Sequence, residues 1–151
     1  MRTLKSSADR QSIVQRISAL SPSDRGVWGQ MTVGQMICHV SDSYRVALGE
    51  KTVSVAPVRV PRPVYKWLAL RLPVKWPKGV PTRPEVQQGV GGTVPADFHA
   101  DRTELLSVLA RFCETGNGLS VVHPIFGDMT SEDWLRWGYL HADHHLRQFA
   151  R

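Results

Sequence analysis

Three of the six histidines of this 151-residue chain fall within five positions near its end: His141, His144 and His145. Side chains four positions apart on a helix lie one above the other, so His141 and His145 share a face, whereas His144 points to one side. Two imidazoles placed in this way can bind one zinc, nickel, copper or iron ion. The alternative is that one histidine is a hydrogen-bonded core residue and the others are solvated. The pair by itself does not decide between the two.

A third histidine, His39, belongs to a separate predicted helix that has an amphipathic pattern of its own. Its face also carries Gln35, Met36 and Val46. Two antiparallel helices can bring three imidazoles to one metal ion, but only if the fold places His39 beside His141. Without such partners, His39 would be an ordinary hydrogen-bonded core histidine.

Motifs for several other kinds of catalysis are missing from the sequence. It has no Gly-rich phosphate loop, no G-x-S-x-G nucleophile motif and no clustered cysteines, so nucleotide hydrolysis and serine-hydrolase chemistry have no support. Cys38 directly precedes His39, but neighbouring helical side chains diverge by about 100°, which argues against a Cys-His pair. Cys38 and Cys113 match no paired spacing, and we expect free thiols in a reducing compartment.

Helices must position these histidines, and the hydrophobic periodicity predicts four main ones. They run from Ser6 or Ser7 to Leu20, from the cap Thr32 to about Leu48, from Asp97 or Asp101 to a stop at Gly116-Asn117-Gly118, and from the cap Thr130 to Ala150. Thr32 with Gln35, and Thr130 with Asp133, have the spacing of a capping box. Gly49 is a suitable stop for the second helix.

A long crossover separates the second and third predicted helices. Eight of the ten prolines lie between Gly49 and Asp97, which excludes a long helix there and leaves room for one short helix, Val64 to Leu72. Leu119 to Val122 is β-like but too short to build a sheet on. The sequence therefore predicts one all-α domain over residues 1–151, a four-helix bundle with a Pro-rich crossover.

Composition and the distribution of apolar residues indicate which class of protein this is. Hydrophobic residues make up 42% and charged residues 21%, as in ordinary folded proteins. No signal peptide is apparent, and the most apolar stretch, around Val64 to Val74, is interrupted by charges and Pro73, so we expect a cytoplasmic protein that does not cross a membrane.

The net charge of +6 is concentrated in one segment. Residues 50–85 contain eight Lys or Arg and only two acids, Glu50 and Glu85. One interpretation is that this segment is a solvent-exposed crossover kept soluble by its charge. The other is that it forms the rim of a site and attracts an anionic substrate or partner. Nucleic-acid binding is the weaker form of the second interpretation, because no helix-turn-helix, zinc-finger or RNA-recognition signature accompanies the basic residues.

Two stretches of the chain resemble the DinB-like (YfiT-like) four-helix bundles, in particular a subgroup of unassigned function. The first is WGQMTVGQMICHVSD, residues 28–42, which resembles the family's second-helix segment with its single metal-binding histidine. The second is HPIFGDMTSEDW, residues 123–134, together with HADHHLRQ, residues 141–148, which resembles the last-helix segment. Elsewhere the chain matches only in helix count and in the long crossover.

The resemblance implies a metal site and two kinds of reaction. His39, His141 and His145 would bind one divalent ion, zinc or nickel before iron, with coordination positions open for water or substrate. Water on the metal could attack an ester or amide, or the metal could activate a low-molecular-weight thiol. Asp42 and Gln148 would orient the metal-binding histidines or the substrate without binding the metal themselves. Alternatively, both are ordinary polar residues at the rim of the helical bundle. No protein side chain is assigned as the catalytic group.

Two hypotheses for function remain open from the sequence. The first is a metal-dependent hydrolase or thiol S-transferase acting on a small molecule, with an anionic substrate entering under the basic crossover. The second is a non-enzymatic stress or interaction protein whose metal site is vestigial or merely stabilising. A homodimer is expected by analogy with DinB-like relatives, many of which associate through helix faces. His123, in a turn before the last helix, is expected to serve packing and not ligation.

Overall fold

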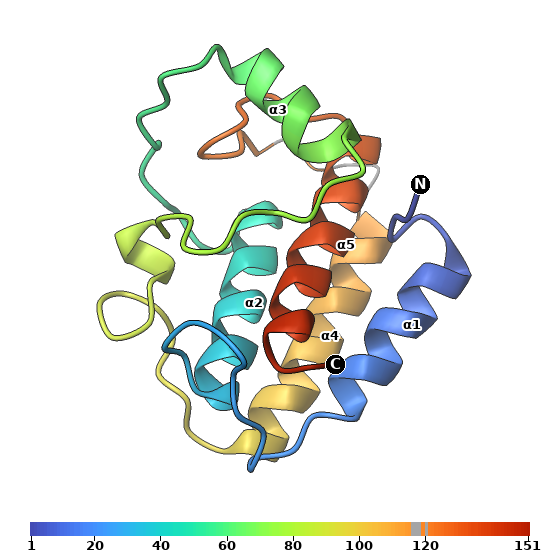
Figure 1. The fold of residues 1–151 in the computed structure, drawn as a ribbon, viewed down its shortest axis with the longest axis vertical. Coiled ribbons are helices and arrows are strands. Elements are labelled where there is room, and N and C mark those ends of the chain that lie inside the picture. Colours follow the sequence, from blue (N-terminus) through green and yellow to red (C-terminus); the bar gives the residue numbers. More distant parts are fainter. Residues whose placement is uncertain (116–118, 120) are drawn as a thin grey trace.

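The computed structural model describes residues 1–115, 119 and 121–151, and these residues are helical wherever they are regular. The elements are α1 (Ser7–Ser18), α2 (Val33–Ala47), α3 (Arg62–Arg71), the 3-10 turn η1 (Pro84–Val86), α4 (Phe98–Thr115) and α5 (Ser131–Gln148) (Figure 1). Within this part of the chain no strand forms, which confirms the all-α prediction. None of the described helices has both the length and the apolar character needed to cross a membrane.

Capping boxes begin both helices that carry the histidines, as predicted. At α2, Thr32 Oγ1 accepts from the Gln35 backbone N–H at 3.2 Å, and Gln35 Oε1 accepts from the Thr32 N–H at 2.9 Å. Thr130 and Asp133 make the same reciprocal pair at α5. Because a cap fixes the first residue of its helix, it also fixes the face on which each later side chain appears.

The end of α5 differs from the sequence-based prediction of a helix continuing to Ala150. The helix ends at Gln148, because Ala150 adopts φ 57° and its N–H donates to the Arg147 carbonyl, while the Arg151 N–H donates to the Leu146 carbonyl. This is the bond pattern of a Schellman motif, which usually requires glycine at the left-handed position. An alanine there leaves no sequence signal for the stop.

Other helix boundaries differ by a few residues from the predicted ones. α3 begins at Arg62 and not at Val64, since proline is tolerated in a first helical turn. α1 ends at Ser18, two residues before the predicted Leu20. At the start of α4, the Asp97 carboxylate accepts from the Ala100 N–H at 2.8 Å, so Asp97 is the cap. The predicted stop at 116–118 lies outside the described residues, as does residue 120 of the predicted β-like run.

α1, α2, α4 and α5 lie side by side, with α2 and α1 each packed against both α4 and α5 (Figure 1). Tyr44, Phe112 and Trp134 are fully buried between them. Gly138 on α5 permits a close approach, because a Cβ at this position would lie 2.6 Å from Cε1 of Phe112. Its carbonyl also accepts a 2.9 Å hydrogen bond from the Tyr44 hydroxyl.

Four of the eight basic residues of segment 50–85 hold the crossover in place against the rest of the fold. Arg62 donates to the carbonyls of Pro124, Ile125 and Ala56. Lys66 and Arg71 pair with Asp133 on α5, and Lys51 pairs with Asp42 on α2. The other four are Arg59, Lys75, Lys78 and Arg83. The sequence interpretations, a solvated excursion or a charged rim, missed this structural role, which depends on contacts between distant parts of the chain.

Candidate metal centre

His39 on α2 meets His141 and His145 on α5 in one cluster. Each of the three offers a ring nitrogen, and these ligand atoms all lie within 4.8 Å of one another. The ring centroid of His145 is 4.8 Å from those of both His39 and His141, and the latter two are 5.3 Å apart. His39 and His145 are buried and His141 is half-buried. The predicted convergence of three histidines from two helices is therefore present, and the cluster can bind a metal ion.

Hydrogen bonds hold two of the three rings from behind. Nδ1 of His39 lies 3.1 Å from the Val86 carbonyl of η1, and Nδ1 of His145 lies 3.1 Å from Oε1 of Gln148. Both partner atoms are acceptors, so each Nδ1 carries the proton and each Nε2 keeps a free lone pair. Acceptors behind metal-binding histidines commonly fix the tautomer and ring orientation in this way.

Gln148 connects the cluster to the loop before α2. Its Nε2 donates to the Trp28 carbonyl at 2.9 Å while its Oε1 meets His145. Gly29 allows this arrangement, since its backbone has φ 77° and a Cβ there would lie 2.5 Å from the Gln148 amide nitrogen. Gln148 therefore contacts a candidate ligand directly, and its expected role in orienting that ligand stays a prediction.

Burial lowers the pKa of each clustered histidine. For His39, desolvation is the largest cause of its lowered pKa, and the Val86 carbonyl and Asp42 act against it. Burial and then the neighbouring imidazoles hold the pKa values of His141 and His145 well below the ordinary value. Neutral rings at physiological pH are the form that binds a metal.

His141 is fixed by stacking and not by a hydrogen bond. Its ring lies against Trp137, with centroids 5.1 Å apart and planes 12° from parallel. Within the described part of the chain its buried Nδ1 has no hydrogen-bond partner. Most buried polar atoms in folded proteins have a hydrogen-bond partner, so this nitrogen is available to a water molecule or another ligand.

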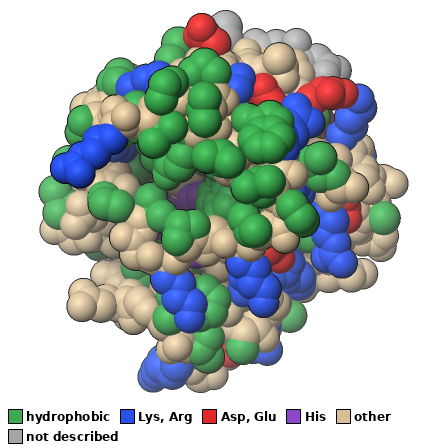
Figure 2. Space-filling view, turned by 45° about the horizontal axis from the view of Figure 1, so that its top comes forward, with side chains coloured by type: hydrophobic (Ala, Val, Ile, Leu, Met, Phe, Trp, Pro, Cys, Tyr) green, Lys and Arg blue, Asp and Glu red, His purple; other side chains and the backbone are tan. Residues whose placement is uncertain are grey.

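A pocket of about 530 Å³ opens over the cluster, and all three histidines line it. Its walls come from α3, from the segment between α3 and η1, and from residues 123–126. Figure 2 shows apolar side chains around a hollow in which a histidine is visible. The volume lies in the range of small-molecule sites, about 300 to 1,000 Å³.

His144, which helix geometry places to one side of the ligand pair, also lines this pocket. Its ring lies 6.1 Å from that of Trp28 and 6.4 Å from that of Trp76, and its buried Nδ1 has no partner among the described residues. Burial lowers its pKa. Sequence reasoning could not place His144 in the pocket, because Trp28 and Trp76 come from loops with no periodic pattern.

Asp42 anchors the crossover. Its fully buried carboxylate accepts hydrogen bonds from the Thr93 N–H at 2.8 Å and the Thr93 hydroxyl at 2.7 Å, and pairs with Lys51 at 2.8 Å. No hydrogen bond joins it to a histidine in the described part of the chain. The expected role for Asp42 beside the ligands stays a prediction.

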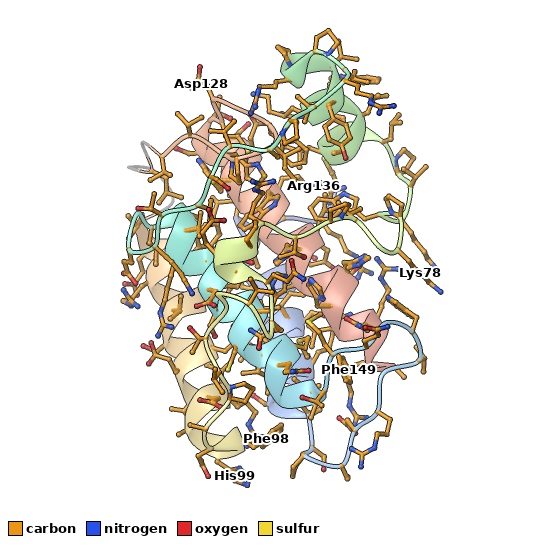
Figure 3. All side chains as sticks on the ribbon, turned by 90° about the vertical axis from the view of Figure 1, so that its left-hand side faces the viewer. Lys78, Phe98, His99, Asp128, Arg136 and Phe149 are labelled. Carbon is orange, nitrogen blue, oxygen red and sulfur yellow. The ribbon has the colours of Figure 1, made fainter. Side chains whose placement is uncertain are left out.

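His123 and His99 lie outside the cluster. Nδ1 of His123 accepts from the N–H groups of Ile125 and Phe126 at 3.1 Å, and its ring stacks on Phe126 with centroids 4.5 Å apart. Burial lowers the pKa of His123 to about 3. His99 is exposed at the start of α4 (Figure 3).

Both cysteines are free thiols. Burial is the largest cause that raises the pKa of Cys38 and of Cys113, in each case to about 11. Thiols with raised pKa values are poor nucleophiles at neutral pH.

Comparison with known proteins places the chain in a family. Searches of curated proteins and of solved structures found no match. A family model described as a protein of unknown function (DUF1569) matches residues 2–151, a range that includes all three clustered histidines. The chain therefore belongs to the DUF1569 family.

Proposed function

We propose that this chain is a metal-dependent enzyme of the DinB-like type, a four-helix bundle of α1, α2, α4 and α5 in which His39, His141 and His145 hold one divalent ion. Zinc and nickel are the first choices and iron the next, because imidazole ligands suit all three. The observation that carries the proposal is the convergence of three imidazole ligand atoms within 4.8 Å, inside a pocket large enough for a small molecule.

The donor set fits a transition-metal ion and not a hard cation such as magnesium, because all three donors are imidazole nitrogens. The Val86 carbonyl and the Gln148 amide leave the Nε2 lone pairs of His39 and His145 free for ligation. A bound metal ion would also give the buried Nδ1 of His141 a partner, which this atom lacks among the described residues. Three protein ligands leave at least one coordination position open, which is typical of catalytic sites.

Such an ion supplies Lewis acidity, which polarises a carbonyl and lowers the pKa of a bound water or thiol. Either hydrolysis or transfer involving a low-molecular-weight thiol would use this property. The protein contributes the orientation of its ligands, through Gln148 and Val86, and an apolar pocket wall that limits access of water. A merely stabilising metal site, in a non-enzymatic protein, would not need an apolar pocket leading to its ligands.

Metal analysis of tag-free protein by inductively coupled plasma mass spectrometry tests the ligand set. We expect about one zinc, nickel or iron per chain, lost in His39→Ala, His141→Ala and His145→Ala. His144→Ala is the matched control, since it removes an adjacent pocket histidine outside the proposed set, and it should retain the metal. No metal after reconstitution, or equal loss in the control, would refute the three-histidine site.

Cobalt substitution separates the enzyme from the stabilising-site alternative. Cobalt(II) bound by three histidines with an open position should change its visible spectrum when azide or a small thiol is added. An unchanged spectrum would mean that the coordination sphere is closed, and it would favour the non-enzymatic alternative.

A further inference from the structure

The wall of the pocket above the histidines is mostly apolar. It includes Tyr65 and Leu68 of α3, Trp76 and Val80 of the segment that follows, and Ile125 and Phe126 before α5. Leu68 and Val80 are 38% and 44% exposed, so the apolar wall continues to the mouth of the pocket. A ligand that covered these side chains would remove apolar surface from water, which favours an apolar body.

The charged groups of the pocket all have one sign. Lys75 and Arg83 line it, whereas no Asp or Glu is among its described lining residues. Lys75 has no ion pair or hydrogen bond within the described residues, and Arg83 bonds only to the Ser54 hydroxyl. A cleft with low-dielectric walls and cations of one sign concentrates anions.

A third cation lies at the edge of the same pocket. Lys78, labelled in Figure 3, sits over the ring of Trp28, with its Nζ 4.4 Å from the ring centroid. Trp28 is itself a lining residue of the pocket. This contact joins the segment after α3 to the loop before α2. Three of the four basic residues of segment 50–85 that do not hold the crossover in place therefore lie at the pocket: Lys75, Lys78 and Arg83. The fourth, Arg59, does not line it.

From this combination we infer that the pocket binds an anionic amphiphile, a molecule with an apolar body and one carboxylate or sulfonate group. The body lies between α3 and the residue 123–126 segment, and the anionic group faces Lys75 and Arg83. The inference rests on the proposed function in one respect: a metal ion at the histidines is what would act chemically on the bound amphiphile. Binding itself needs no metal.

Two fluorescent probes with the same aromatic skeleton test this inference. One is 8-anilinonaphthalene-1-sulfonate, and the other is N-phenyl-1-naphthylamine, which lacks the sulfonate. With metal-free protein we expect the sulfonate to bind about fivefold to tenfold more tightly at low ionic strength, as expected for one or two solvent-screened charge pairs. High salt should remove this advantage. Decanoate should displace both probes more effectively than 1-decanol.

The matched variants are two double substitutions that each remove two positive charges. Lys75→Gln with Arg83→Gln should abolish the preference for the sulfonate and leave binding of the neutral probe unchanged. Lys5→Gln with Arg111→Gln removes cations that do not line the pocket, and it should leave the preference intact. Equal binding of the two probes to wild-type protein, or a preference that survives loss of Lys75 and Arg83, would overturn the inference.

Metal analysis and probe binding together distinguish failure of the proposed function from failure of this inference. A chain that binds no metal but prefers the sulfonate through Lys75 and Arg83 would refute the metalloenzyme and support the amphiphile site. A chain that binds metal at the three histidines but shows no preference between the probes would overturn only the present inference.

Discussion

Gln148→Leu removes both hydrogen bonds of the Gln148 amide while keeping a side chain of similar volume. Nδ1 of His145 and the Trp28 carbonyl then lose their partners, which should lower the free energy of unfolding of the metal-free protein by about 1–3 kcal/mol. The ring of His145 is also no longer held in one orientation. Loss of such a partner behind a ligand weakens metal binding by about 10- to 100-fold.

Gln148→Glu separates the two effects. A carboxylate still offers an acceptor to the His145 N–H, but it has no donor for the Trp28 carbonyl. We expect zinc affinity close to that of wild type, measured by competition with a chromophoric chelator, together with a loss of stability in urea comparable to that of the leucine variant. If Gln148→Leu loses stability but binds zinc as tightly as wild type, Gln148 serves packing alone and its positioning role is refuted.

Two further predictions concern residues outside the ligand set. Gly138→Ala places a Cβ 2.6 Å from Phe112 Cε1. The resulting strain should lower the free energy of unfolding in urea by about 1–3 kcal/mol, although alanine has a better helix propensity than glycine. An unchanged urea midpoint would contradict the close packing. The pKa of His123 is lowered to about 3, so below about pH 6.5 the unfolded chain binds a proton that the folded chain does not. Stability should therefore fall with decreasing pH by about 1.4 kcal/mol per unit more in metal-free wild type than in His123→Asn, and equal slopes would show that His123 protonates without unfolding.

The starts of α2 and α5 were predictable from the sequence because their causes are local. Thr32 and Gln35, and likewise Thr130 and Asp133, lie three positions apart and satisfy each other's backbone groups without help from the rest of the fold. The end of α5 was not predictable in this way. Ala150 takes a conformation that usually belongs to glycine, so no residue type marked the stop.

The same division applies to the candidate site. The sequence alone determined that His141 and His145 share a face, since four residues make about one helical turn. Only the tertiary structure decided that His39 joins them, that the Val86 carbonyl holds the ring of His39, and that His144 enters the pocket. It also decided which basic residues of segment 50–85 hold the crossover in place and which lie at the pocket. The reason is physical: periodicity and capping act within a few residues, whereas these contacts join α2, α5 and a long crossover that no local rule positions.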